Sequence, residues 1–218
     1  MNEAFFHRTL LAWFACNRRD FPWRNDPIEP FVSLVTELLL QRTKADSIAG
    51  TFPLILDVYR TPEQVITRGQ ARIVDDLTPL GLQQRRAASL VDIATDILEH
   101  HGGKVPATEE DLLQLQGVGK YIANAVLCFG FGQPAPIVDG NVTRLFCRFF
   151  NLENRGDNRR NVHIWEKAGE IIDIEPETAK QLNWAILDFA ALVCTPRNPR
   201  CIECALNEHC NYYSSIIH

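Results

Sequence analysis

The sequence of 218 residues lacks the features that would place it in a membrane or outside the cell. It has no run of about eighteen uninterrupted apolar residues, so we expect no membrane-spanning segment. The amino end, MNEAFFHRTLLAWFACNRRD, has an apolar stretch interrupted by His7, Arg8 and Thr9 and no small-residue cleavage site of a secretory signal. It shows no internal repeat and no low-complexity linker. We therefore expect a cytoplasmic protein with no membrane partner, in which thiols stay reduced.

The sequence also lacks the alternation of apolar and polar residues that predicts β-strands. Helical patterns recur instead: residues 31–43, FVSLVTELLLQRT, repeat apolar side chains at amphipathic spacing, and TPEQVITR opens with Thr61 followed by proline at the first helical position. Residues 86–103 end in paired glycines, which suit the carboxy end of a helix. With 46% hydrophobic residues the chain can bury a core, and we predict an all-α protein.

A net positive charge is missing as well. The formal net charge of −5 argues weakly against a polyanionic partner. Basic residues nevertheless gather in QRTK, LQQRRAA and TPRNPR, which are residues 41–44, 82–88 and 195–200. These runs indicate either a basic face on an acidic protein or ordinary solvated charge.

Cysteine is scarce outside one short segment. Three of the seven cysteines, Cys16, Cys128 and Cys147, have apolar neighbours and are interpreted as buried packing residues. The others follow the pattern C-x6-C-x2-C-x5-C: Cys194, Cys201, Cys204 and Cys210. Disulfides would need an oxidising compartment, and zinc sites usually combine two short cysteine pairs. The uneven spacing favours an iron–sulfur cluster, with zinc and disulfides as alternatives.

Residues 107–132, ATEEDLLQLQGVGKYIANAVLCFGFG, predict two helices joined by a tight hairpin. Thr108 and the acidic residues after it mark a helix start, and this helix is predicted to run to Gln116. The hairpin is GVG, Gly117 to Gly119, and a second helix follows at once. Backbone N–H groups at such a hairpin can bind a phosphate oxygen without reading sequence, although glycine also serves packing alone.

Three motifs in this order resemble the endonuclease III group of DNA glycosylases, the helix-hairpin-helix proteins with a Gly/Pro-rich loop and an aspartate. The motifs are LQGVGKY, IVDGNVTRL and the four-cysteine pattern, and the resemblance extends from RDFPWR to Cys210. One departure is Gln116, where the family usually has proline. The resemblance implies a monomeric enzyme of the nucleoid, a double-stranded DNA partner with a mismatched or modified base, and a [4Fe-4S] cluster on the four cysteines.

The resemblance also implies two lobes. Residues 27–133 would form a helical lobe with the hairpin, and residues 1–26 would pack with 134–218 as the cluster lobe. The cleft between the lobes would receive a nucleotide extruded from the duplex, a step that is easiest at a mismatch.

The family's catalytic aspartate corresponds to Asp139. Pro134 and Pro136 exclude helix before it, and a new helix is predicted from about Asn141, so Asp139 is expected near a helix amino end. Cleavage of an N-glycosidic bond builds positive charge on the deoxyribose, which a fixed carboxylate stabilises, and the same group can orient or deprotonate water. The alternative is an ordinary helix-capping aspartate.

The second residue after the hairpin separates two reaction types in this family. Members with lysine there form a Schiff base with the sugar and also cut the strand. This sequence has Tyr121, and Lys120 lies one residue earlier, about 100° around the helix. The resemblance therefore implies a monofunctional enzyme that leaves an abasic site. Lys120 is interpreted as a phosphate contact or a surface charge. The hairpin residues are expected to contact the DNA backbone: Gly117, Val118 and Gly119.

Glu37 lies at the position where MutY-type adenine glycosylases keep a glutamate that protonates the purine, and thymine glycosylases acting on T·G pairs carry a similar run. Its alternative interpretation is a solvated helix carboxylate. The family inserts side chains into the space left by the extruded base, and the corresponding residues here are Gln41, Arg42 and Thr43. Leu82 and Gln83 are also expected to contact the DNA.

Two features favour thymine or uracil opposite guanine as the substrate. MutY enzymes usually have GLGYY where this chain has PLGLQQRRA, and they usually add a carboxy-terminal domain, whereas this chain ends eight residues after Cys210. The motif IVDGNV, however, has the sequence that is usual in MutY enzymes. Adenine opposite guanine or 8-oxoguanine, another modified base, and a non-catalytic DNA-binding iron–sulfur protein stay open as alternatives.

Overall fold

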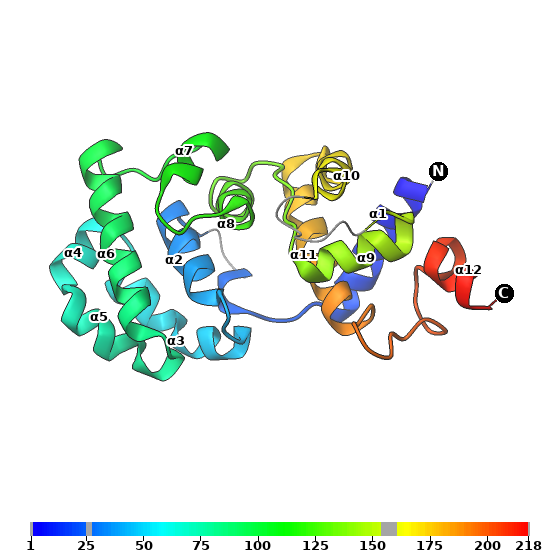
Figure 1. The fold of residues 1–218 in the computed structure, drawn as a ribbon, viewed down its shortest axis with the longest axis horizontal. Helices are drawn as coiled ribbons and strands as arrows, with labels where there is room; N and C mark the ends of the chain where they lie inside the picture. The colour runs from blue at the N-terminus through cyan, green and yellow to red at the C-terminus, as the bar shows by residue number, and fades with distance from the viewer. Residues whose placement is uncertain (1, 25–27, 154–160, 218) are drawn as a thin grey trace. The chain divides into compact units, whose positions relative to one another are not determined.

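The computed structural model describes residues 2–24, 28–153 and 161–217, and within these ranges the chain is helical with no β-strand (Figure 1). This confirms the all-α prediction. No helix in the described ranges is long and apolar enough to cross a membrane. Of the cysteines expected to pack in the interior, Cys128 is buried, Cys147 is partly exposed and Cys16 is exposed. The interpretation of Cys16 was therefore wrong, because its side chain lies on the outer side of its helix.

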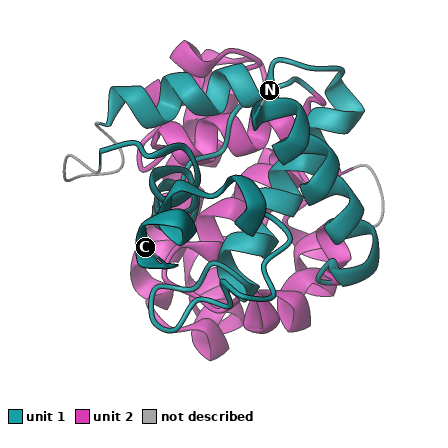
Figure 2. Ribbon diagram, turned by 90° about the vertical axis from the view of Figure 1, so that its right-hand side faces the viewer, with its two compact units in different colours: residues 1–19, 133–218 teal, residues 20–132 magenta. Residues whose placement is uncertain are grey.

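The chain forms two compact units, which Figure 2 colours separately. Unit 1 consists of residues 1–19 and 133–218, and unit 2 of residues 20–132. The boundary expected between residues 26 and 27 lies outside the described residues. The segment just before it belongs to unit 2, because the Trp23 ring packs against Phe52 with 5.7 Å between ring centroids.

Unit 2 is a set of helices joined by short connections. Its elements are η1 Pro22–Arg24, α2 Pro30–Leu40, α3 Ala45–Val58, α4 Pro62–Arg68, α5 Gln70–Leu77, η2 Thr78–Leu80, α6 Gln83–His100, α7 Glu109–Gln114, α8 Lys120–Ala125 and the π-helix η3 Val126–Gly130. The capping signal before α4 is confirmed, since the Thr61 hydroxyl accepts from the backbone N–H of Gln64. Helix α2 forms part of the core with Leu34, Val35 and Leu39, which are fully buried.

The hairpin between α7 and α8 begins earlier than predicted. Helix α7 ends at Gln114 instead of Gln116, because Leu115 adopts an extended conformation. Val118 N–H then donates to the Leu115 carbonyl at 3.1 Å, and Gly117 has φ +84°. This is the arrangement of a type II turn, whose third residue needs the positive φ that glycine tolerates. Thr108 caps α7 as predicted, accepting from the backbone N–H of Asp111.

Helix α2 and the π-helix cross at close range. A Cβ atom on Gly130 would lie 2.8 Å from the Cα atom of Pro30, so only glycine fits at this crossing. The π-helix itself is closed by Phe131 N–H donating to the Val126 carbonyl. The contact fixes the segment that follows α8 against the start of the helix that carries Glu37.

Unit 1 contains α1 Asn2–Asn17, α9 Gly140–Phe150, α10 Val162–Ile172, α11 Pro176–Leu192, η5 Asn207–His209 and α12 Asn211–Ile217. Phe6 of α1 packs against Phe146 and Phe149 of α9, with ring centroids 5.9 and 4.9 Å apart. Arg19, the last residue of the amino-terminal segment, forms an ion pair with the fully buried Asp188 of α11 at 2.6 Å. Residues far apart in the sequence are thereby joined in one core.

Candidate functional site

Glu37 is a buried acid on α2, with only 5% of its surface exposed. The Tyr121 hydroxyl donates a hydrogen bond to it, and Oε2 has no hydrogen-bond partner among the described residues. Burial raises the pKa of Glu37 to about 7, although the Tyr121 hydrogen bond and the charge of Arg24 oppose this shift. The interpretation as a solvated carboxylate is therefore wrong. Near neutral pH this carboxyl group can hold a proton and donate it.

The glycine hairpin lies beside the predicted space-filling residues. The Gln41 side chain donates to the Gly117 carbonyl at 3.5 Å, so the loop after α2 and the hairpin are neighbours. Gly117 and Gly119 are exposed, whereas Val118 is buried and anchors the turn in the core. The Lys120 ammonium lies 3.9 Å from a Glu109 carboxylate oxygen. This ion pair joins the first residue of α8 to the first residue of α7.

The other predicted DNA contacts lie in two exposed segments of unit 2. Arg42 and Leu82 are exposed residues with left-handed backbones, at φ 58° and 54°. Gln83 begins α6 directly after Leu82. Arg86, expected at the sequence level to belong to a basic surface run, is instead buried beneath both segments and hydrogen-bonds to them. The sequence gives no sign of this burial.

Asp139 is the N-cap of α9, as its predicted place near a helix amino end requires. Its Oδ1 atom accepts from the backbone N–H groups of Asn141 and Val142 at 2.8 and 2.7 Å, and Oδ2 accepts from the Asn141 side chain at 2.8 Å. The side chain remains partly exposed. Three N–H donors and the helix dipole therefore orient the carboxylate and suit a negative charge.

A hydrogen-bond chain that the sequence did not reveal joins Asp139 to the cysteine segment. Asn141, which donates to Asp139, accepts from the Arg144 guanidinium at 3.0 Å. Arg144 also donates to the backbone carbonyls of Cys194 and Ala190, both at 2.8 Å. The only sequence signal was arginine spaced three residues from Asn141 on a helix, which is not specific. The amino end of α9 and the start of the cysteine segment are thus held together.

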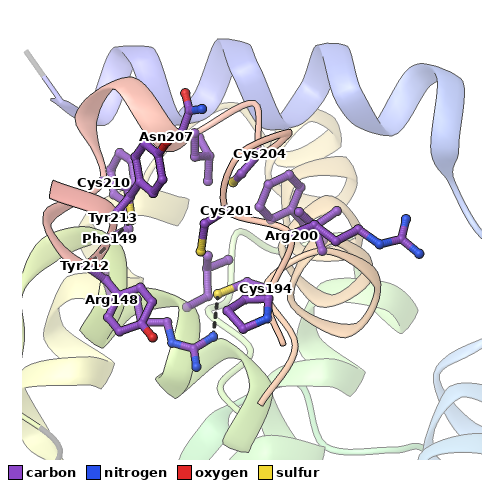
Figure 3. A pocket seen from close by; sticks show the side chains of 15 residues that line it. Arg148, Phe149, Cys194, Arg200, Cys201, Cys204, Asn207, Cys210, Tyr212 and Tyr213 are labelled. Carbon is purple, nitrogen blue, oxygen red and sulfur yellow. Dashed lines mark hydrogen bonds between the residues drawn. The ribbon is translucent and has the colours of Figure 1, made fainter. Parts of the chain in front are cut away.

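The four cysteines of the pattern line one cavity of unit 1, together with Arg148, Phe149 and Tyr212 (Figure 3). Burial and the nearby thiols raise the pKa of Cys204 to about 11. The Arg148 guanidinium lies 3.3 Å from the Cys194 sulfur and stacks over the Tyr212 ring at 4.7 Å. Within the described ranges, no group of three or more His, Cys, Asp or Glu side chains could hold a metal ion. The four thiols and the Arg148 guanidinium thus line the same cavity.

The site residues thus form two sets. In unit 2 the structure brings together Glu37 with Tyr121 and the hairpin with Gln41, and in unit 1 it joins Asp139 to the cysteine segment. Helices α7 and α8, joined by the glycine hairpin, form a helix-hairpin-helix. Residues 35–169 match the family model of the HhH-GPD superfamily base excision DNA repair protein, and the chain belongs to this superfamily.

Three proteins similar to this chain are DNA glycosylases. A thymine/uracil-DNA glycosylase of Methanothermobacter thermautotrophicus is 34% identical over 208 residues, which cover 95% of this chain and 93% of that protein. An adenine DNA glycosylase of Mycobacterium tuberculosis is 36% identical over 200 residues, covering 91% of this chain and 64% of that protein. The solved structure of a thermostable thymine-DNA glycosylase matches with a TM-score of 0.91 at 33% identity, covering 98% and 97% of the two chains.

Proposed function

We propose that this protein is a monofunctional DNA glycosylase of base excision repair that removes thymine or uracil mispaired with guanine. Its family membership and the identity to thymine/uracil-DNA glycosylases over nearly the whole chain support this reaction. The observation that carries the proposal is the presence of two carboxyl groups in different environments, one in each unit. One unit presents a carboxylate fixed by three N–H donors, and the other a buried carboxyl group that can carry a proton.

Asp139 acts on the sugar in this proposal. As the bond between C1′ and the base breaks, positive charge develops on the deoxyribose, and the oriented carboxylate stabilises it. The same carboxylate can orient the water that attacks C1′ and accept its proton. Because the helix dipole and the Asn141 contacts already hold the carboxylate in place, little reorganisation is needed when the charge appears.

Glu37 acts on the base. A departing pyrimidine gains negative charge on its carbonyl oxygens, and the neutral carboxyl of Glu37 can donate a hydrogen bond to such an oxygen. Tyr121 holds the Glu37 side chain and supplies no amine, so we expect no Schiff base with the sugar. The released product is an abasic site in an intact strand.

The experiment that tests this function is a panel of labelled duplexes containing T·G, U·G, A·G, A·8-oxoguanine or modified cytosine, assayed with excess enzyme. We expect excision from T·G and U·G, with strand breakage only after alkali or heat. Efficient borohydride trapping of a protein–DNA adduct would contradict the monofunctional mechanism. Lack of excision from every duplex would contradict the glycosylase assignment.

A second candidate is an adenine glycosylase. The specific observation in its favour is the pKa of Glu37 near 7, because a protonated carboxyl group also suits donation to a purine nitrogen. The identity to the mycobacterial adenine DNA glycosylase points the same way. In the panel, this candidate predicts excision of adenine opposite guanine or 8-oxoguanine and none of thymine.

We also propose that Cys194, Cys201, Cys204 and Cys210 hold a [4Fe-4S] cluster. When bound, the cluster would cross-link the loop between α11 and α12 and could supply a redox centre. Arg148 beside the Cys194 sulfur provides a positive charge for a thiolate ligand. Anaerobic purification should give a yellow-brown protein with about four irons per chain. Stoichiometric zinc without iron would contradict this proposal.

A further inference from the structure

Arg86 contacts two loops that are distant in sequence, and only 8% of its surface is exposed. From α6, its Nη1 atom donates to the carbonyls of Leu80 and Gly81, each at 2.9 Å. Its Nη2 atom donates to the carbonyls of Leu39 and Gln41 at 3.2 and 3.0 Å, and to the Thr43 hydroxyl. One guanidinium therefore joins the turn before α6 to the loop after α2.

All of these acceptors are neutral oxygens. No carboxylate pairs with Arg86 in the described part of the chain, and burial lowers the pKa of its guanidinium. Burying a cation without an anion is unfavourable unless its N–H donors are used. Here both terminal nitrogens donate hydrogen bonds, mostly to backbone carbonyls. The planar guanidinium holds its N–H groups in fixed directions, so it can bind several carbonyls at once. The contacts of Arg86 define the shape of the two loops and form no ion pair.

Each loop carries one exposed residue in a left-handed backbone conformation. Arg42 follows the Gln41 carbonyl that Arg86 binds, and Leu82 follows the Gly81 carbonyl that it also binds. Left-handed backbones are unfavourable for residues with a side chain and persist only where surrounding contacts impose them. Leu82 is 54% exposed, so a large apolar side chain is presented to solvent from this left-handed position. The strain and exposure occur at the two points adjacent to the Arg86 contacts.

We propose that Arg86 is a positioning residue that holds the loops bearing Arg42 and Leu82 in one fixed relative geometry, so that both side chains enter the duplex together at the extruded nucleotide. The proposal rests on the proposed glycosylase function. Arg86 itself does not touch the DNA. Its role differs from that of a phosphate-binding arginine, because its charge is buried and its donors are already occupied by the protein.

The test uses R86K, with R86Q as a second variant. Lysine keeps the charge but offers a single ammonium that cannot reach both sets of carbonyls. R85Q is the matched control, because Arg85 is the exposed neighbour on the same helix and loses the same charge. The readouts are single-turnover excision from a T·G duplex and the fluorescence of 2-aminopurine beside the mismatch, which reports unstacking. Thermal melts confirm that each variant is folded.

We expect R86K and R86Q to lower excision about tenfold and to lose most of the unstacking signal, because misplacing groups by about 1 Å has effects of this size. Affinity for a fully paired duplex should change less than about twofold, since phosphate contacts remain. If Arg86 only stabilised the fold, R86K and R86Q would have lower melting temperatures, and the unstacking signal of the folded fraction would not change. R85Q should keep the unstacking signal.

A double-mutant cycle with L82A sharpens the test. If Arg86 acts through Leu82, the R86K change should lower excision no more than about twofold in the L82A background. Full additivity of the two changes would overturn the proposal. Wild-type excision by R86K would do the same. Failure of both Arg86 variants to fold would show that Arg86 holds the unit as a whole, which would also overturn it.

Hydrogen exchange provides a measurement that does not depend on activity. In R86K, amides of residues 41–44 and 80–83 should exchange faster together, while those in the centre of α6 stay protected. An unchanged exchange pattern in either loop would overturn the proposal even if the enzyme is active. If the wild-type protein excises no base from any duplex, the proposed function fails, and hydrogen exchange still decides whether Arg86 couples the loops.

Discussion

Each unit contains a carboxyl group, and the two groups differ in exposure and hydrogen bonding. In unit 1, Asp139 is partly exposed, and both of its oxygens accept hydrogen bonds at the start of a helix. In unit 2, Glu37 is buried, and one of its oxygens has no partner among the described residues. Hydrogen bonds from the start of α9 orient the Asp139 carboxylate, whereas burial favours the neutral acid of Glu37. The proposed reaction uses both: an oriented carboxylate and an acid that can hold a proton.

The largest expected effect comes from removing the charge of Asp139. D139N keeps the side-chain size and an oxygen that can cap α9, so the fold should survive. We expect single-turnover excision to fall at least about 10²-fold, because one major electrostatic stabiliser of the transition state is lost. Duplex affinity should hold or rise, since a carboxylate repels phosphates.

D173N is a suitable control for this measurement, because Asp173 is an exposed aspartate of the same unit. It should excise at the wild-type rate. A folded D139N enzyme that excises as fast as the wild type would remove Asp139 from the mechanism and leave Glu37 as the main candidate.

The next effect is on stability, and it concerns Glu37. A carboxyl group whose pKa rises from 4.5 to about 7 on folding contributes stability that is present below pH 4.5 and is lost as the pH rises through 7. The loss is at most about 3 kcal/mol. E37Q resembles the neutral acid at every pH. We therefore expect E37Q to match the wild type in unfolding free energy near pH 4 and to exceed it by about 3 kcal/mol near pH 8.

Urea unfolding at both pH values measures this difference. E99Q, which changes an exposed glutamate of the same unit, should show no comparable dependence on pH. Y121F removes the hydrogen bond that lowers the pKa of Glu37, so the midpoint of the Glu37-dependent change should move to higher pH. Equal stability of E37Q and the wild type across this range would show that Glu37 is not held neutral.

The smallest effect is expected at the hairpin. K120A should weaken duplex binding modestly and reduce the slope of log affinity against log salt by up to about one, with little change in the chemical step. K104A removes an exposed lysine of the same unit and should leave the slope unchanged. Fluorescence titrations over a range of salt concentrations measure both. A large fall in single-turnover rate for K120A would instead place its amine in the chemistry.

Local features such as helix caps could be predicted from the sequence, whereas the burial of charged side chains could not. The caps at Thr61 and Thr108 and the place of Asp139 at a helix start depend on neighbouring residues, so they could be predicted. The end of α7 was missed by two residues, because the turn at Gly117 extends the backbone before it.

Glu37 and Arg86 were harder to predict as buried residues, since charged side chains are almost never fully buried. Their burial depends on α8 and on loops that are far away in sequence. The resemblance to a family located Glu37 as a site residue but not its environment. Nothing in the sequence pattern indicated Arg86.

The close crossing of Gly130 and Pro30 has a consequence for genetics. A side chain at position 130 would push apart the beginning of α2 and the π-helix that follows α8. Glu37 lies on α2, and Tyr121 lies on α8 directly before the π-helix. A random screen for loss of repair should therefore recover G130A and larger replacements as inactive alleles. Such alleles would alter no residue assigned to DNA or base.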